Sequence, residues 1–216
     1  MPRPLPLFAD RTEAGRKLLP LLQARGFADP VVYALPRGGV PVALPIAQAL
    51  HAPLDLLLVR KLGVPWQPEL GFGAIAEGLE EPLLNQDIIA ATGLTEDMIA
   101  PVLAAEQREL ARRSAVYVKG RLRQDPKGRI VILVDDGLAT GITARAGLAA
   151  LRKRGAARLM LAVPIAAPES VAEFEGLADE VITAETAPIR CGIGAFYQDF
   201  HQISDAEMLK MLAGTT

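Results

Sequence analysis

Short apolar runs alternate along the chain with segments in which apolar residues recur at helical spacing. The apolar runs are expected to be buried strands, at residues 31–35, 54–60, 129–134, 159–163 and 180–183. The helical segments lie at residues 10–26, 38–50, 143–154 and 205–212. Alternating strands and helices predict an α/β fold, with a doubly wound, mostly parallel central sheet.

The segment between the second strand and the central strand does not follow this alternation of strands and helices. From Lys61 to about Leu84 it is rich in Gly and Pro, and a loop this long inside a compact domain is usually functional or contains a hairpin. Residues 71–77 could form part of such a hairpin. Helices are expected at 86–92 and from Thr95, which can cap a helix whose first turn is acidic. We therefore expect residues 1–216 to form one domain, with a lid and helical insert at 62–118 whose role stays open.

Composition excludes several classes of protein. The formal net charge is −2, so no basic surface for nucleic acid is expected. The chain has one cysteine, which forms neither an internal disulfide nor a metal cluster. No segment approaches the roughly 20 apolar residues of a membrane span, and the N-terminal apolar stretch is too short for a signal peptide. These features predict a cytoplasmic protein without a membrane or nucleic-acid partner.

The segment 129–143 carries the strongest chemical signal. A wholly apolar strand ends in Asp135 and Asp136, and a turn with two Gly and two Thr residues leads into a helix. A helix N-terminus presents free N–H groups and a positive dipole end to a phosphate, and glycines let the backbone approach it. Two carboxylates would repel that phosphate but accept hydrogen bonds from a neighbouring diol. The pattern indicates a sugar phosphate, whereas an ordinary strand-to-helix turn explains it less well.

Two better-known phosphate motifs are absent from this segment. No lysine follows Gly141, as a Walker A loop requires, and no Gly-x-Gly-x-x-Gly follows the strand. The segment instead resembles the signature of the type I phosphoribosyltransferases, which bind 5-phosphoribosyl 1-diphosphate (PRPP). Further similarity to a bacterial branch of that family lies in Leu35-Pro-Arg-Gly-Gly-Val-Pro-Val-Ala43 and Arg60-Lys61-Leu-Gly.

The resemblance implies a role for each part of the signature. Asp135 and Asp136 would bind the ribose hydroxyls. The 5-phosphate would lie in the loop formed by Gly137, Leu138, Ala139, Thr140, Gly141, Ile142 and Thr143. Family members that act on 6-oxopurines carry an acid where this chain has Ala139. The sequence of this loop is closer to that of members that act on adenine. Any general acid or base must therefore come from elsewhere.

Two basic segments are candidates for the diphosphate. Arg37, Gly38 and Gly39 follow the first strand and resemble the diphosphate loop of the family, although glycines can also serve a plain helix entry. Arg60 and Lys61 are expected at the end of the second strand, on the same edge of the sheet, where they could bind phosphate oxygens. The alternative is that Arg60 and Lys61 are solvated surface residues, as basic residues at a strand end usually are.

The family also implies a mobile lid and a hood that selects the acceptor. The hood is expected at 187–204, where Phe196, Tyr197 and Phe200 could stack on a base and His201 could hydrogen-bond it. Packing of these aromatic residues onto the core is an equally good interpretation. In the lid, Glu77 or Glu69 could contact the acceptor, although each could equally be a surface acid.

The function that the resemblance implies is transfer of the phosphoribosyl group of PRPP to a nitrogenous acceptor, with release of diphosphate. Asp135, Asp136, Arg37 and Lys61 would be the catalytic residues, and the protein is expected to be a homodimer. Mg²⁺ is the expected cofactor, with no direct protein ligand assigned, although the two aspartates could hold it through water. A regulatory protein that binds PRPP or a nucleotide without catalysis is the main alternative, and a phosphohydrolase or nucleotide phosphorylase is a third.

Overall fold

A computed structural model of the chain describes residues 5–214. Its centre is a sheet of five parallel strands in the order β2-β1-β6-β7-β8. The bounds of these strands are β1 Val31–Ala34, β2 Leu54–Leu56, β6 Ile130–Val134, β7 Arg158–Ala166 and β8 Glu180–Thr186. The predicted α/β fold with a parallel, doubly wound sheet is confirmed.

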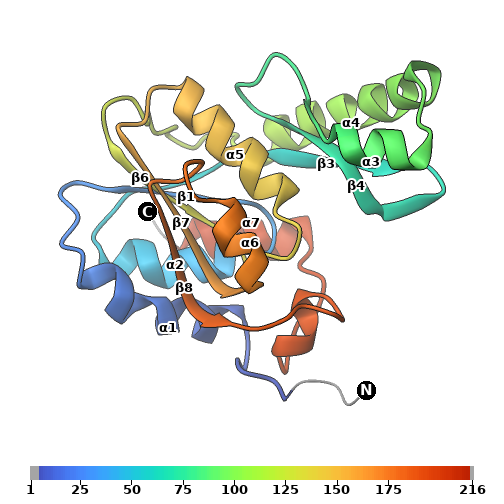
Figure 1. The fold of residues 1–216 in the computed structure, drawn as a ribbon. Helices are drawn as coiled ribbons and strands as arrows, with labels where there is room; N and C mark the ends of the chain where they lie inside the picture. The colour runs from blue at the N-terminus through green and yellow to red at the C-terminus, as the bar shows by residue number, and fades with distance from the viewer. Residues whose placement is uncertain (1–4, 215–216) are drawn as a thin grey trace.

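Helices cover both faces of this sheet (Figure 1). One face carries α1 (Arg11–Gln23), α2 (Gly39–Ala49) and α7 (Asp205–Ala213), and the other carries α5 (Ile142–Lys153) and α6 (Pro168–Glu173). Successive strand residues point to opposite faces, so Ile132 packs with the first group and Leu133 with the second. Burial on both faces explains why β6 is apolar without interruption. The sequence pattern did not predict the short helix α6.

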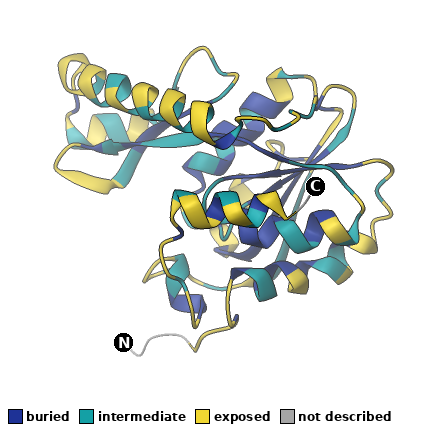
Figure 2. Ribbon diagram, turned by 180° about the vertical axis from the view of Figure 1, so that it is seen from behind, coloured by how far each residue is buried: buried dark blue, intermediate teal, exposed yellow. Residues whose placement is uncertain are grey.

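The insert forms a lobe beside the sheet, at the upper right of Figure 1. It consists of β3 (Val59–Val64), β4 (Gln67–Ala76), β5 (Leu83–Leu84), α3 (Gln86–Thr92) and α4 (Glu96–Tyr117). The strands form an antiparallel sheet in the order β3-β4-β5, so the expected hairpin is present. Leu62 and Phe72 lie in an apolar cluster of the lobe with residues of α3 and α4. The outer side of α4 is largely exposed (Figure 2).

The prediction of one strand over residues 54–60 is wrong. Strand β2 ends at Leu56, and the chain crosses from the central sheet to begin β3 at Val59. Leu57 and Leu58 are buried on opposite faces, in two different apolar clusters. An unbroken apolar run therefore concealed the crossing. As a result, Arg60 and Lys61 lie within β3 rather than at an edge of the central sheet.

A buried ion pair fixes this crossing. Asp55, with 1% of its surface exposed, accepts hydrogen bonds from Arg123 Nε at 3.0 Å and from the backbone N–H of Gln124 at 2.8 Å. Arg123 also donates to both carboxylate oxygens of Glu77, at 2.8 and 3.1 Å. The two carboxylates are the main reason why the pKa of the Arg123 guanidinium is raised. Strands β2 and β4 are thereby joined to the segment that precedes β6.

The hood segment 187–204 contains only a short 3-10 helix, Ile193–Phe196, and pairs with the N-terminal segment. The backbone N–H groups of Leu7 and Phe8 donate to the carbonyl of Phe196, at 2.8 and 3.0 Å. The hood is thus built from both ends of the chain. Within residues 5–214, none of the helices combines the length and apolar character needed to cross a bilayer.

The Asp55–Arg123 pair leads to a test of the fold. Replacing Arg123→Met leaves the buried carboxylate of Asp55 without its partner, and such a loss costs about 3–5 kcal/mol. We expect urea denaturation to show this drop in the free energy of unfolding. The double variant Asp55→Asn with Arg123→Met should recover part of the loss. A cost below about 1 kcal/mol for Arg123→Met would contradict the proposed role of the pair.

Candidate active site

Asp135 and Asp136 follow the last residue of β6 and are both half-buried. Arg11 of α1 reaches them, with its Nε 2.8 Å from Asp136 Oδ2. The backbone N–H of Asp136 donates to Asp135 Oδ1 at 2.8 Å, and the hydroxyl of Tyr197 donates to the carbonyl of Asp136 at 2.7 Å. The pair is therefore held from the central sheet, from α1 and from the hood.

The two carboxyl groups are electrostatically unequal. Burial raises the pKa of Asp135, and the neighbouring charge of Asp136 raises it further. Burial also raises the pKa of Asp136, but the guanidinium of Arg11 opposes that rise. Arg11 compensates one negative charge and leaves most of the second uncompensated. Such a site favours a ligand that brings hydroxyl donors or a cation.

The loop from Gly137 to Thr143, the predicted phosphate loop, leads from the acid pair into the N-terminus of α5. Gly141 has φ +68° at the N-cap of α5, and the first turn of α5 leaves backbone N–H groups without an acceptor inside the helix. A Cβ on Gly141 would lie 2.5 Å from the ring of Phe174, so both conformation and space require glycine. The hydroxyl of Ser170 donates to the carbonyl of Ala139 and holds the loop against α6.

The loop that contains Arg37 packs directly onto the acid pair. A Cβ on Gly38 would lie 2.1 Å from Asp136 Oδ2, and one on Gly39 would lie 2.6 Å from the carbonyl oxygen of Val134. These glycines are required by close packing against β6. Gly39, a predicted diphosphate residue, has no free backbone donor, because its N–H donates to the Leu35 carbonyl at 3.0 Å. Arg37 and Gly38 remain the candidates of this loop.

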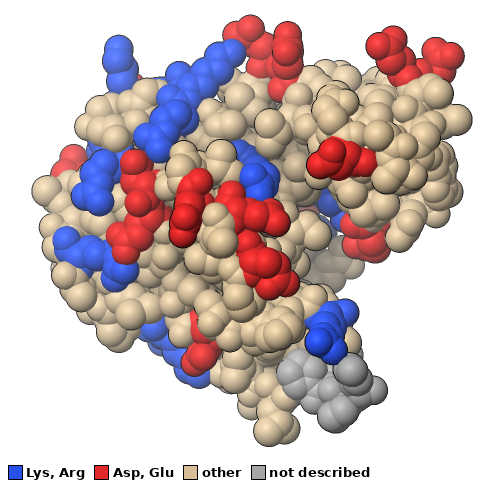
Figure 3. Space-filling view, viewed as in Figure 1, with Lys and Arg blue, Asp and Glu red and all other residues tan. Residues whose placement is uncertain are grey.

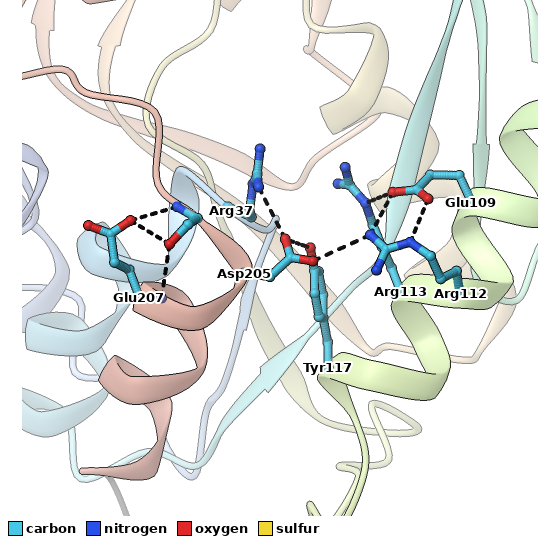
Figure 4. Close-up of polar contacts among 8 residues, drawn as sticks. Arg37, Glu109, Arg112, Arg113, Tyr117, Asp205 and Glu207 are labelled. Atoms are coloured by element: carbon cyan, nitrogen blue, oxygen red, sulfur yellow. Dashed lines mark hydrogen bonds and ion pairs between the residues drawn. The ribbon is translucent and has the colours of Figure 1, made fainter.

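Asp205, the first residue of α7, holds Arg37 in place (Figure 4). Its Oδ1 accepts from Arg37 Nη1 at 3.1 Å and from the Tyr117 hydroxyl at 2.6 Å, and its Oδ2 lies 3.3 Å from Arg112 Nη2. The Tyr117 hydrogen bond is the largest stabilising contact that lowers the pKa of Asp205, followed by Arg112 and Arg37. One carboxylate therefore connects the Arg37 loop, the insert and the C-terminal helix.

A cleft of about 450 Å³ opens beside the acid pair. Its walls bring together Asp136, residues of the hood and four arginines, Arg11, Arg37, Arg60 and Arg113. Figure 3 shows the lobe that carries α3 and α4 separated from the rest of the surface by a hollow in which Lys and Arg atoms are visible. The volume falls in the range of small-molecule sites, and the guanidinium groups favour an anionic ligand.

A larger hollow of about 820 Å³ lies between the insert and α5. Thr140 and Ile142 of the phosphate loop form part of its wall, as does Gly71 of β4. None of the acid pair, Arg37 or Arg60 lines it. We therefore take the smaller, charged cleft as the candidate active site.

The structure separates two residues, Lys61 and Glu77, from the cleft with which the sequence grouped them. Arg60 lines the cleft, where its Nε donates to Glu106 at 2.6 Å, but Lys61 does not line it and lies 3.1 Å from the carbonyl of Glu69 across the hairpin. Glu77 lines neither hollow and is engaged by Arg123. The expected contacts of Lys61 with diphosphate and of Glu77 with the acceptor are therefore not supported by their positions.

The hood aromatics divide between core and cleft. Phe196 and Tyr197 each have 4% of their surface exposed and pack with Phe8, so their faces are not available to a base. Phe200 lines the cleft instead, and the guanidinium of Arg11 stacks on it at 3.7 Å from the ring centroid. His201 is exposed and contacts Asp199 through Nδ1 at 2.9 Å. Core packing is thus the correct interpretation for two of the four side chains.

Two charged residues of the cleft escaped the sequence analysis. Arg11 lies in a helix remote in sequence from the acid pair, and Arg113 lies on α4 of the insert. The one available signal was the placement of Arg11 directly after the cap Asp10, on the helix face that is buried with Ala14 and Leu18. An arginine on a buried face requires a partner, which here is Asp136.

Comparison with known proteins identifies the family of the chain. The sequence profile described as phosphoribosyl transferase domain matches residues 14–194. A Mycobacterium tuberculosis protein with a provisional phosphoribosyl transferase name is 46% identical over 207 residues, which are 95% of this chain but 46% of that protein. The chain thus spans about half the length of this relative. A uracil phosphoribosyltransferase of Staphylococcus haemolyticus is 35% identical over 98 residues, 43% of this chain and 47% of its own.

Solved structures give the same result for the fold. The crystal structure of the protein TT1426 from Thermus thermophilus superimposes with a TM-score of 0.79 at 36% identity. The alignment covers 96% of this chain and 98% of that chain. Insert and hood are therefore included in the similarity.

The charge on the acid pair predicts a pH-dependent stability. Because the pKa of Asp135 is raised in the folded state, its ionised form costs stability above that pKa, and the cost disappears below the ordinary aspartate range of about 3.9. Asp135→Asn should therefore raise Tm at pH 7, and the gain should vanish near pH 4. One kcal/mol moves Tm by about 2–4 °C in a chain of this size, which thermal denaturation resolves. A lower Tm at pH 7 would show that the carboxylate is stabilised rather than strained.

A second prediction concerns the phosphate loop. Gly141→Ala places a Cβ against Phe174 at positive φ, so we expect destabilisation of about 1–3 kcal/mol and loss of phosphate-ligand binding. Gly176→Ala is the matched control, because it has φ +83° but no atom within 4 Å of its added Cβ. Equal effects of the two substitutions on ligand binding would argue against a specific role for this loop.

Proposed function

We propose, from the premise that the chain belongs to the phosphoribosyltransferase family, that it transfers the phosphoribosyl group of PRPP to a nitrogen nucleophile and releases diphosphate. The observation that carries this proposal is that three parts of the structure meet at the acid pair, although the phosphate loop lines the larger hollow and not the charged cleft. The acid pair lies between the phosphate loop that follows it and the Arg37 loop, whose Gly38 packs onto Asp136.

These parts correspond to the three groups of PRPP. The 5-phosphate would lie on the N–H groups at the start of α5, where the helix dipole favours an anion. The ribose diol would donate its hydroxyls to Asp135 and Asp136. The diphosphate would then point toward Arg37 and Arg60, the cations that line the cleft from the core and from the insert.

Mg²⁺ fits this donor set. The described residues contain no cluster of three or more His, Cys, Asp or Glu side chains that could hold a metal by themselves. Mg²⁺ commonly binds through one or two carboxylates together with substrate phosphates and water, and the uncompensated charge of the acid pair favours a cation. When bound with PRPP, Mg²⁺ would neutralise charge on the leaving diphosphate, and Asp135 and Asp136 would hold it through water.

The chemical step demands little covalent participation from the protein. The bond between the ribose anomeric carbon and the diphosphate oxygen breaks, positive charge develops on the ring, and a bond to the acceptor nitrogen forms. Asp135 and Asp136 orient the ribose and stabilise that positive charge, while Arg37 stabilises the departing diphosphate. Fixed positions and charges would therefore supply most of the acceleration.

One observation favours a second candidate function, a PRPP-binding protein without catalysis. Among the described residues that line the cleft, Asp136 is the only carboxylate, and Arg11 already occupies it. A site without a free base suits a sensor, or an acceptor that needs no proton removed by the protein. Binding of PRPP without turnover across nitrogenous acceptors would establish this alternative.

Calorimetric titration with PRPP, with and without Mg²⁺, tests the proposal. We expect binding that depends on Mg²⁺ and that weakens about 10- to 100-fold in Asp136→Asn, the range for loss of a charge-assisted hydrogen bond. Glu77→Gln is the control and should bind as the natural chain does, because Glu77 contacts Arg123 instead of the cleft. An acceptor screen for diphosphate release follows. If Asp136→Asn leaves the affinity for PRPP unchanged, the ribose does not bind to the acid pair.

A further inference from the structure

Arg113 is a cation of the cleft that PRPP, placed as proposed, does not account for. The phosphate loop, the acid pair, Arg37 and Arg60 together receive all three groups of PRPP, and Arg11 is neutralised by Asp136. Arg113 comes from α4 of the insert and not from the PRPP motif. Its side chain is only 14% exposed, so its burial indicates a fixed rather than a solvated cation.

Neighbours on α4 hold Arg113 in place. Its Nε donates to Glu109 Oε1 at 2.7 Å, and its guanidinium lies 6.0 Å from the centre of the Tyr117 ring. Arg112 shares the Glu109 carboxylate, and the two arginines lower the pKa of Glu109 to about 2, so this anchor stays ionised at neutral pH. A contact through Nε leaves the terminal nitrogens of Arg113 for a ligand. A fixed guanidinium of this kind suits a carboxylate, which it can bind through two parallel hydrogen bonds.

Phe200 supplies an aromatic side chain in the same cleft. It is half-buried, with the Arg11 guanidinium 3.7 Å from its ring centroid and the tilted Tyr197 ring 4.9 Å away between centroids, so its orientation is fixed. Ile193 and Ile203 of the hood complete an apolar wall beside it. An aromatic and apolar wall favours a planar ring, and the arginine favours a negative charge on that ring.

We propose that the acceptor is a planar nitrogen heterocycle that carries a carboxylate, with its ring against Phe200 and its carboxylate on Arg113. This inference rests on the proposed function and names the class of its second substrate. The lone pair of the acceptor nitrogen would attack the anomeric carbon as the bond to diphosphate breaks, and where that nitrogen carries a proton, the released diphosphate takes it. The carboxylate remains unchanged and serves only for recognition.

Matched ligand pairs test this inference. The probes are uracil against its 6-carboxylate, orotate, and nicotinamide against nicotinate, titrated into the full chain with magnesium diphosphate present so that no transfer occurs. We expect the carboxylated member of at least one pair to bind about 10-fold or more tightly than its neutral partner, as a charge-assisted contact allows. Arg113→Gln should abolish this preference, and Arg113→Lys should retain part of it.

Arg108→Gln is the matched control, because Arg108 is an exposed arginine of the same helix that does not line the cleft. It should keep the carboxylate preference, and all variants should have comparable Tm values. PRPP affinity, measured on the same proteins, should change less than about threefold in Arg113→Gln.

The outcomes separate the two proposals. Failure of the natural chain to bind PRPP overturns the proposed function itself. If PRPP binds, three results overturn only the inference on the acceptor. These are no preference for the carboxylate in either pair, a preference that survives Arg113→Gln, and a large loss of PRPP affinity in Arg113→Gln, which would assign Arg113 to diphosphate.

Discussion

The structure around the cleft depends on the cost of placing two adjacent carboxylates, half-buried, at the end of the central strand. An unpaired buried charge is expensive, so the surrounding elements are arranged to compensate it. Arg11 reaches Asp136 from α1, the hood donates a hydrogen bond from Tyr197, and the Arg37 loop carries glycine where any side chain would collide with Asp136. The compensation is incomplete, because one cation faces two acids. The residual charge favours a ligand that brings hydroxyl donors or a cation.

The insert contributes to the cleft through the same kind of electrostatic contact. Asp205 joins the Arg37 loop to α4 by way of Tyr117 and Arg112, as Figure 4 shows. Arg60 and Arg113 are held by carboxylates of α4 itself. The wall of the cleft opposite the sheet edge thus consists of guanidinium groups fixed before any ligand arrives. Preorganised charges of this kind lose little energy to rearrangement when an anion binds.

Local patterns in the sequence predicted the central sheet and the phosphate loop because both are local in origin. Strand β6, the acid pair and the glycines of the turn are contiguous in sequence. Each of them can be interpreted from its own residues, without knowledge of distant contacts. The crossing from β2 to β3 was missed because Leu57 and Leu58 are buried on both sides, and an apolar run does not reveal which sheet receives it. The role assigned to Lys61 followed from that error, since it was placed at the end of the second strand, whereas Glu77 was chosen as an acid of the predicted lid.

Contacts between segments that are distant in the chain could not be predicted from the sequence. Arg11 and Asp136 are 125 positions apart, and nothing in either segment specifies the other. The aromatic residues of the hood had two equally good interpretations, and packing with Phe8 decided between them for Phe196 and Tyr197. Only the three-dimensional arrangement shows that Phe200 and Arg113 face one cleft.

A crystal structure of the chain with PRPP and Mg²⁺ tests the central claim most directly. The account predicts the 5-phosphate on residues 137–143, the ribose hydroxyls on Asp135 and Asp136, and the diphosphate beside Arg37. It also predicts that Arg11 stays on Asp136, since the second carboxylate oxygen remains for the ribose. PRPP bound with its diphosphate in the larger hollow beside α5, or with its ribose away from the acid pair, would contradict the account.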